Sequence, residues 1–385
     1  MKLLHLGDLH LGRSLGDYDL YEDQKYILDR ILEIAEKNSV DAVLIAGDVY
    51  DKAIPSESAT GLLDSFLSSL AEKKIRTFMI SGNHDSDDRL NFGSALFRNS
   101  HIFISAICKG KLDKYVLEED GTKVNVFQLP IVKASQVRYF YPDETIETYE
   151  DAVRVMIEHA GIDPEERNVL VAHQYVVGKG EDPILGGSEG AAAQNVGTVE
   201  KIGYGIFDMF DYVALGHIHS AQRVGRDEVR YSGSPLKYSL SEVNSAKSVP
   251  LITFEGNEPV KIELVPLTPM RDLRHIRGTM EELLDAGNIK APEDFIYVTL
   301  TEEDVVNDAM GIFRQVYPNT VKIDYDNSHT RQIGQADISA IAEDRPFSAL
   351  ISDFYRLMYG CDITEEELAV MRAVAGEAGV PDETR

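Results

Sequence analysis

The chain has 385 residues, of which 43% are hydrophobic and 27% charged, and a formal net charge of −27. This length exceeds one compact core, so two or three domains are expected. No apolar run approaches membrane-spanning length and the start lacks a signal-peptide pattern, which predicts a cytoplasmic protein. The two cysteines, Cys108 and Cys361, have no zinc-type or disulfide-framework spacing. The negative charge argues against non-specific binding of nucleic acid by the whole surface, although bound dications or a small basic groove would still permit a nuclease.

The first part of the chain alternates apolar, strand-like runs with helical patterns, which favours a layered α/β domain. Strands are expected at residues 3–6, 42–45 and 77–80, and helices at residues 22–37 and 56–74. Both helices have an apolar stripe at helical spacing, which is typical of helices that pack on a core.

The stripe of the second helix admits two interpretations. Its members are Leu62, Leu63, Phe66, Leu67 and Leu70. In the first interpretation, all five side chains pack in the core. In the second, the stripe has more apolar residues than a peripheral helix requires, and it forms part of a homodimer face. Charged residues at positions 63 and 66 would distinguish the two, because only a contact face would leave a folded monomer.

From residue 123 onward the strands become shorter. They are expected at residues 124–127, 168–172, 212–215 and 229–231, with a closing hairpin at residues 251–254 and 261–265. A glycine- and alanine-rich stretch lies between His173 and Val199, and we interpret it as a mobile loop near the mouth of a site. A linker is expected at residues 266–269.

The last third predicts a small α+β module followed by two helices. The module contains a short helix from Thr279, a strand at 295–301, a helix at 305–317 and a strand at 321–325. The penultimate helix carries an apolar stripe made of Phe347, Leu350, Ile351, Phe354, Leu357 and Met358. A capping box at residues 364–367 opens the final helix. The expected domains are therefore residues 1–268, 269–333 and 334–385.

Five short clusters of metal-ligand side chains each follow an apolar run. They are Asp8-Leu9-His10, Gly47-Asp48-Val49-Tyr50-Asp51, Gly82-Asn83-His84-Asp85, the single His173, and Gly216-His217-Ile218-His219. One such cluster alone is typical of a surface turn. Five of them at the carboxyl ends of strands predict a site, because ligands bind at strand ends in α/β sheets.

The residue types favour two divalent cations that clamp a phosphodiester. We expect Asp48 to bridge them, with Asp8, His10 and His219 on one ion. The other ion would be held by Asn83, His173 and His217. Among the expected ligands only Asp8 and Asp48 carry negative charge. Two dications would therefore leave the site net positive, which suits an anionic substrate. Mixed imidazole and oxygen ligands disfavour Mg²⁺, and the absence of a thiolate gives no preference for Zn²⁺, so Mn²⁺ is the first choice.

His84 directly follows an expected ligand, so it is predicted to face the substrate and to stabilise the transition state or protonate the leaving oxygen. Asp51 is placed to hydrogen-bond the far nitrogen of His84, although a capping or loop carboxylate is an alternative interpretation. Asp85 has no expected role beyond capping a turn. The five histidines outside the clusters have no expected role; they are His5, His101, His159, His275 and His329.

These clusters resemble the motif set of the calcineurin-like metallophosphoesterases. More specific features resemble the DNA double-strand-break repair nucleases of that family. They are the start from Asp8 to Gly12, the segment from Tyr231 to Ser239, and the small module with its trailing helices. The resemblance implies a layered α/β β-sandwich flanked by helices, with an α+β capping domain and a C-terminal helical pair. Two departures are the small-residue-rich loop at 178–198 and the acidic surface.

The resemblance further implies a manganese-dependent DNA exonuclease and endonuclease that forms a homodimer and binds an ATPase with long coiled coils. The stripe of residues 347–358 cannot bury itself in a short isolated helical pair, so it would dock in a groove of that ATPase or on its own chain.

Two other functions remain open from the sequence. A phosphodiesterase acting on a nucleotide or other small molecule would share every metal ligand, but would not need the 270–330 module or the terminal helices. A catalytically inert scaffold would have no reason to keep the whole ligand set and His84.

Overall fold

The computed structural model describes residues 1–119, 121–187, 201–328, 330, 346–359 and 362–377. The chain divides into two compact units, Met1–Leu273 and Arg274–Arg385. The expected loop between His173 and Val199 lies partly outside the described residues, as do residues 331–345. The expected separation of a segment 334–385 from a domain 269–333 therefore stays a prediction.

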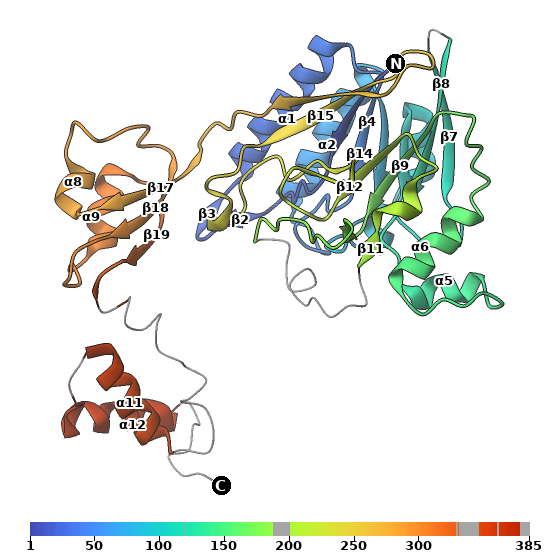
Figure 1. Ribbon diagram of the computed structural model, residues 1–385. Helices are drawn as coiled ribbons and strands as arrows, with labels where there is room; N and C mark the ends of the chain where they lie inside the picture. Colours follow the sequence, from blue (N-terminus) through green and yellow to red (C-terminus); the bar gives the residue numbers. More distant parts are fainter. Residues whose placement is uncertain (120, 188–200, 329, 331–345, 360–361, 378–385) are drawn as a thin grey trace. The chain divides into compact units, whose positions relative to one another are not determined.

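Two six-stranded sheets form the first unit (Figure 1). The first sheet has the order β16-β15-β1-β4-β5-β6. Its strands are β1 Lys2–Leu6, β4 Ala42–Ala46, β5 Arg76–Ile80, β6 Ile102–Ser105, β15 Ser248–Thr253 and β16 Lys261–Pro266. Strands β1, β4, β5 and β6 are parallel, so their carboxyl ends lie at one edge. The hairpin β15–β16 adds antiparallel strands beside β1.

The second sheet has the order β13-β14-β12-β9-β8-β7. Its strands are β7 Asp113–Glu119, β8 Thr122–Leu129, β9 Asn168–His173, β12 Tyr212–Gly216, β13 Gln222–Val224 and β14 Arg226–Tyr231. Strands β8, β9, β12 and β14 are parallel to one another, and the edge strands β7 and β13 are antiparallel to β8 and β14. This sheet also has an edge where several parallel strands end together.

The central strands have apolar side chains on both faces, which explains why the two sheets pack face to face. Alternate residues of a strand point to opposite faces. One set from each sheet forms a shared buried cluster, which includes Ala42, Leu44, Phe78, Val169, Val171, Tyr212 and Ala214. The intervening residues face outward against helices. Burial of both faces accounts for the nearly continuous apolar runs of β4, β9 and β12 in the sequence.

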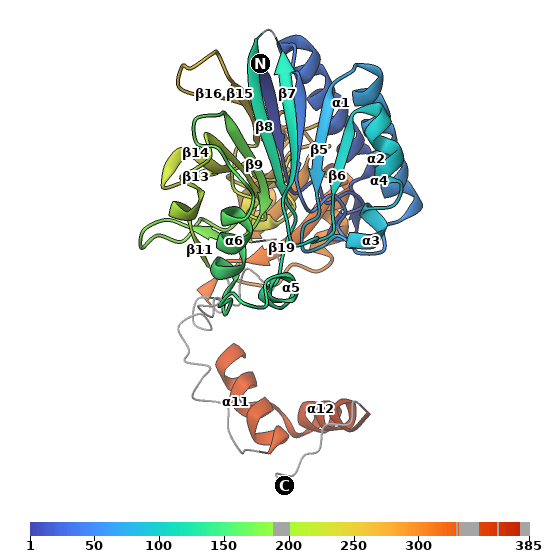
Figure 2. The ribbon, with the colours of Figure 1, turned by 90° about the vertical axis from the view of Figure 1, so that its right-hand side faces the viewer.

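Helices cover the outer faces of both sheets (Figure 2). On the first sheet lie α1 Tyr21–Asn38 and α2 Glu57–Glu72, with the short helices α3 Asp87–Leu90 and α4 Ser94–Phe97 nearby. The second sheet packs against α5 Ala134–Phe140 and α6 Tyr149–Glu158 through a second buried cluster. Smaller elements complete the unit: β2 Ser14–Leu15, β3 Tyr18–Asp19, β10 Val176–Val177, β11 Ile202–Gly203, and the 3-10 turns Arg98–Ser100, Tyr204–Phe207 and Leu240–Glu242.

The apolar stripe of α2 belongs to the core. Leu63 and Phe66 are 6% and 2% exposed, and the other members of the stripe are equally buried. These side chains therefore pack in the core, as the first interpretation expects, while Leu63 and Leu67 also line the wall of a surface groove, so their part in a homodimer face stays a prediction. Charged residues at positions 63 and 66 would disrupt the packing of α2 on the first sheet.

The second unit contains a three-stranded sheet and four helices among its described residues. Its elements are β17 Leu273–Gly278, α8 Met280–Leu284, β18 Phe295–Leu300, α9 Ala309–Val316, β19 Thr320–Tyr325, α11 Phe347–Tyr359 and α12 Glu365–Glu377. The sheet order is β17-β18-β19, and α9 packs on it through Ala309 and Phe313. The predicted capping box is present, because the Glu367 carboxylate accepts from the Thr364 N–H at 2.9 Å and the Thr364 hydroxyl accepts from the Glu367 N–H at 3.3 Å. In the part of the chain that the structure describes, none of the helices is both long and apolar enough to cross a membrane.

Candidate metal centre

All five sequence clusters lie at the carboxyl ends of strands. Strands β1, β4 and β5 of the first sheet precede the clusters of Asp8, Asp48 and Asn83. Strand β9 ends at His173, and β12 precedes His217. The strand-end position that the sequence predicted is therefore present in both sheets.

The loops that follow these strands have a strained backbone. Asp8, His10, Asp48 and His217 all have positive φ, between 44° and 99°, which non-glycine residues rarely adopt. Hydrogen bonds between loops maintain this conformation: the Asp8 N–H donates to the Gly47 carbonyl at 3.1 Å, and the His10 N–H donates to the Asp48 carbonyl at 3.0 Å. The surrounding fold therefore fixes the direction of these side chains.

Two glycines in the clusters are required by close approach. A Cβ atom at Gly82 would lie 2.2 Å from an Asp48 carboxylate oxygen, and one at Gly216 would lie 1.9 Å from the Ala46 carbonyl oxygen. Both distances are far inside van der Waals contact. Glycine at these positions lets the loops of the two sheets come together around the site.

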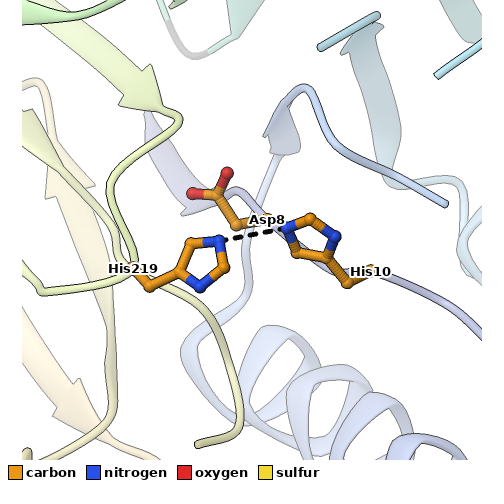
Figure 3. A group of neighbouring side chains, drawn as sticks. All are labelled: Asp8, His10 and His219. Atoms are coloured by element: carbon orange, nitrogen blue, oxygen red, sulfur yellow. Dashed lines mark hydrogen bonds between the residues drawn. The ribbon is translucent and has the colours of Figure 1, made fainter. Parts of the chain in front are cut away.

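Asp8, His10 and His219 form the first group of ligand atoms (Figure 3). One ligand atom from each lies within 4.8 Å of the other two, and all three residues are buried. The Nε2 atoms of His10 and His219 lie 3.0 Å apart. Their Nδ1 atoms face carboxylates instead, at 3.5 Å from Asp51 and 3.8 Å from Glu242.

This arrangement of the two imidazoles fits a cation. A carboxylate behind Nδ1 favours the tautomer with hydrogen on Nδ1, which leaves a lone pair on Nε2. Two lone pairs 3.0 Å apart repel each other unless a cation lies between them. Burial lowers the pKa of His10 to about 4, so its ring is neutral and able to ligate.

Asp48 lies between two groups of ligand atoms. Its Oδ2 is 3.6 Å from His10 Nε2 and 3.5 Å from His173 Nε2. The groups that it joins contain His10 and His84 on one side, and Asp8 and His173 on the other. The His84 N–H donates to Asp48 Oδ1 at 2.8 Å, which favours the ionised form of the carboxylate. An ionised carboxylate in this position can reach two neighbouring cations.

Asn83, His173 and His217 converge on a second position. Asn83 Oδ1 is 3.0 Å from His173 Nε2 and 2.9 Å from His217 Nδ1. His173 donates from Nδ1 to the Ala46 carbonyl at 2.8 Å. Burial lowers the pKa of His173 and brings that of His217 to about 3. The neutral His173 ring therefore directs an Nε2 lone pair toward ionised Asp48, which is favourable only with a cation between them.

The structure corrects the expected partner of His84. His84 donates from Nδ1 to the backbone carbonyl of Asp51 at 2.9 Å, not to its carboxylate. The Asp51 carboxylate instead accepts from Arg13 at 2.8 Å and lies behind His10. Although burial alone would raise it, the pKa of Asp51 is lowered by His10 and Arg13. Asp51 therefore supports His10, and the expectation that its carboxylate orients His84 is wrong.

Asp85 has a larger structural role than the sequence indicated. Its carboxylate accepts from the N–H groups of Val49, Tyr50 and Gly82 at 2.9–3.1 Å. Burial and the nearby Asp48 charge raise the pKa of Asp85 to about 7, while the three N–H groups favour its ionised form. Asp85 thus ties the loop of Asp48 to the loop of Asn83.

Sequence reasoning missed Glu242 and Lys247, which form a buried ion pair at 2.5 Å. The Lys247 ammonium also donates to the His219 carbonyl at 3.0 Å and to Ser234 at 2.8 Å. Burial opposes its charge, but His219 and Lys247 lower the pKa of Glu242 to about 2. The sequence offered little to find them. Ser234 lies in the segment from Tyr231 to Ser239 that resembles the family, but Glu242 and Lys247 lie in no motif.

Comparison with known proteins agrees with this geometry. Residues 1–221 match the calcineurin-like phosphoesterase family. Residues 269–359 match the family described as the type 5 capsule protein repressor C-terminal domain. The D subunit of the nuclease SbcCD from Staphylococcus epidermidis is 36% identical over 327 residues, which cover 84% of this chain and 85% of that protein.

Two solved structures are also similar. The protein TT1561 of Thermus thermophilus is 11% identical, and the match covers 69% of this chain and 99% of that protein with a TM-score of 0.40. A dimetal phosphatase from Danio rerio is 10% identical, and the match covers 70% of this chain and 99% of the phosphatase with a TM-score of 0.37. At these TM-scores the two likenesses carry no argument about this chain.

The chain belongs to the calcineurin-like phosphoesterases and, within them, to the SbcD group that the S. epidermidis protein represents. It is thus a metal-dependent phosphodiester hydrolase, and the expected fold class, a layered α/β sandwich with helices and a C-terminal helical pair, is confirmed.

Proposed function

We propose that the chain is a metal-dependent DNA nuclease with exonuclease and endonuclease activity, acting as the nuclease subunit of an SbcCD-type repair complex. The observation that carries this proposal is the convergence of the seven proposed ligands at strand ends of both sheets, with Asp48 in two of the groups of possible ligand atoms. The identity to the D subunit of a nuclease SbcCD supports DNA as the substrate. We also propose a cytoplasmic location, where the chain would meet its DNA substrate.

The proposed ligands of one ion are Asp8, His10, His219 and Asp48, and those of the other are Asp48, Asn83, His173 and His217. Mn²⁺ is the proposed physiological metal, because imidazole and oxygen donors without a thiolate suit it better than Mg²⁺ or Zn²⁺. When bound, two such dications neutralise phosphodiester charge and make water a stronger nucleophile at neutral pH.

His84 is the proposed catalytic residue that acts on the substrate. Its Nδ1 is committed to the Asp51 carbonyl, so Nε2 is the nitrogen that remains for chemistry. The side chain is more exposed than the proposed ligands His10 and His173, as a group that meets substrate must be. From there it can hold a proton for the leaving oxygen or stabilise developing negative charge. Asp51 is proposed as a positioning residue for His10.

A homodimer is proposed through the short helices that follow the Asn83 loop. Phe92 and Leu96 are 84% and 74% exposed, and Phe92 lines an apolar groove together with Leu90 and Phe97. Exposed aromatic and aliphatic side chains next to an apolar groove are typical of protein contacts. The groove also takes Leu63 and Leu67 from the stripe of α2, so the proposed dimer face combines the exposed short helices with one side of that helix.

The second proposed partner is an SbcC-like ATPase with long coiled coils, giving a heterotetramer. Helices α11 and α12 expose Phe354, Val370, Met371 and Val374. An amphipathic helical pair with exposed apolar anchors suits docking in a groove of a coiled coil.

A nuclease assay tests the proposal. End-labelled duplex and hairpin DNA are incubated with the chain and Mn²⁺, Mg²⁺ or Zn²⁺, with and without the ATPase, beside the aryl diester bis-p-nitrophenyl phosphate. Manganese-dependent cleavage of DNA is expected. Hydrolysis of the aryl diester without cleavage of any DNA would instead indicate a small-molecule phosphodiesterase.

A further inference from the structure

The two proposed ion positions share Asp48 but differ in their surroundings. We call the position with Asp8, His10 and His219 the first site, and the position with Asn83, His173 and His217 the second site. A buried ion pair, Glu242 with Lys247, lies behind the first site at 1% and 8% exposure. An ion pair of this kind adds little to stability over apolar packing, so its place beside His219 points to a role at the metal centre.

Both members of the ion pair hold His219. Glu242 Oε1 faces His219 Nδ1 at 3.8 Å, and the Lys247 ammonium donates to the His219 carbonyl at 3.0 Å. The carboxylate is itself fixed, because its Oε2 lies 2.5 Å from Lys247 and its Oε1 accepts from the Tyr238 N–H at 3.3 Å. A carboxylate behind Nδ1 of a ligating histidine orients the ring and makes Nε2 a stronger donor to a metal ion.

Tyr238 extends this support to the other histidine of the first site. Its hydroxyl donates to the Leu9 carbonyl at 2.5 Å. Its ring makes edge-to-face contacts with both imidazoles, with centroids 5.7 Å from His10 and 6.1 Å from His219. His10 also has the Asp51 carboxylate behind its Nδ1, at 3.5 Å. Both histidines of the first site are therefore backed by carboxylates and contact the same tyrosine.

The second site lacks this electrostatic support. His173 Nδ1 donates to the Ala46 carbonyl, which has no net charge. Asn83 supplies a neutral amide oxygen, whereas Asp8 gives the first site a carboxylate of its own. Since the attraction between a dication and its ligands increases with their negative charge, the first site should bind its ion more tightly.

Access from solvent differs in the same direction. A cleft of about 650 Å³ opens on the second site and is lined by all three of its unshared ligands. None of the unshared ligands of the first site is among the described residues that line this cleft. Asn83 is exposed, whereas Asp8, His10 and His219 are at most 1% exposed. An ion at the second site is therefore more open to exchange.

We propose that residues 234–247 make the first site the tighter of the two, with Glu242 as the positioning residue of His219. The first ion binds in a buried site supported by carboxylates and stays there. The second ion binds afterwards and exchanges through the cleft, so the concentration of free Mn²⁺ sets the fraction of chains that hold both ions. The proposal rests on the proposed function and its division of ligands between two ions.

Calorimetric titration of the full-length, metal-free protein with Mn²⁺ tests the order of binding without requiring turnover. Two steps are expected, the first tighter than the second by about tenfold or more. Glu242→Gln should weaken the tight step by about 10- to 100-fold and leave the weak step within about twofold. Asn83→Ala should do the reverse. Two steps of equal affinity in the wild type would overturn the proposal, as would a Glu242→Gln variant that weakens both steps to the same extent.

A double variant separates this role from general support of the fold. Glu242→Gln removes the carboxylate that faces Lys247 in the interior, so Glu242→Gln, Lys247→Met removes both charges together. It should weaken only the tight step. The matched control is Glu255→Gln, Lys261→Met, which removes an exposed ion pair beside the β15–β16 hairpin and should change neither step.

A folded double variant with both affinities unchanged would contradict the role of Glu242. If the variants of the ion pair do not fold, the titration of Asn83→Ala still decides the order, because loss of the tight step in that variant would overturn the proposal. Failure of the nuclease function is read separately, as two intact Mn²⁺ steps without cleavage of any DNA.

Discussion

His84 donates its Nδ1 hydrogen to the backbone carbonyl of Asp51, 2.9 Å away, rather than to the carboxylate of that residue. A carbonyl oxygen can only accept, so this bond fixes the tautomer and leaves Nε2 as the chemically available nitrogen. A neutral carbonyl also orients His84 without placing a negative charge beside the substrate phosphate.

His84→Gln should reduce phosphodiester hydrolysis by about 10² to 10⁴ while both metal ions stay bound. The reason is that His84 is proposed to act on the substrate and not on the ions. Rate measurements with bis-p-nitrophenyl phosphate and elemental analysis of the same preparation test this. A parallel fall of metal content and rate would show that His84 is a ligand, as its proximity to His10 and Asp48 also permits.

Asp48→Ala should behave in the opposite way and lose metal and activity together, because this carboxylate is proposed to reach both ions. The metal content should fall by more than one ion per chain. Retention of one full equivalent of Mn²⁺ would show that Asp48 does not bridge.

Asp85→Asn should destabilise the protein by about 1–3 kcal/mol, because an amide offers one oxygen where three N–H groups now share a carboxylate. Metal affinity should fall as well, since the loops of Asp48 and Asn83 would no longer be tied together. Urea unfolding and Mn²⁺ titration measure the two effects. Asp88→Asn, on the exposed surface nearby, is the matched control, and equal behaviour of the two variants would contradict the proposed clamp.

The contribution of Asp151 to the free energy of unfolding is expected to depend on pH. Hydrogen bonds from Thr148 lower its pKa to about 2, and its carboxylate caps α6. A lowered carboxyl pKa means stability that is present above the unfolded value near 4 and is lost as pH falls toward 2. Asp151→Asn should therefore cost about 1 kcal/mol near pH 6 and progressively less between pH 4 and pH 2. A difference in unfolding free energy that does not change with pH would contradict this origin.

Removal of residues 336–385 should abolish co-purification with the ATPase and ATP-stimulated processing of duplex DNA. Manganese-dependent cleavage of single-stranded DNA should remain, because the proposed ligands all precede residue 220. Phe354→Glu, at a position 50% exposed on α11, should weaken the complex in the full chain. A truncated chain that binds the ATPase with unchanged affinity would rule out this role.

The place where the candidate ligands come together could be predicted from the sequence because each cluster directly follows an apolar run. The packing of the two sheets then brings together residues as distant as Asp8, which follows β1, and His219, which follows β12. The core likewise followed from the nearly continuous apolar runs of β4, β9 and β12. Which ligands share an ion stays a prediction.

The remaining details depend on tertiary contacts that have no local pattern. The carbonyl rather than the carboxylate of Asp51 meets His84 because the loop conformation, not the residue type, decides which oxygen points inward. Glu242 and Lys247 contact His219 from another segment, and nothing at short range marks them. The stripe of α2 could not be assigned because a core face and a contact face have the same helical spacing.

Each proposed ion takes ligands from both sheets: Asp8 and His10 with His219, and Asp48 and Asn83 with His173 and His217. The parallel strands β1, β4, β5 and β6 of the first sheet are synthesised before β9 and β12 of the second sheet, so the ligands that follow the first set exist long before their partners. A nascent chain that ends before His217 would hold only part of each ligand set and should neither retain ions nor cut DNA. The same division makes each ion a crosslink between layers, so chelation should loosen the docking of one sheet on the other as well as stop hydrolysis.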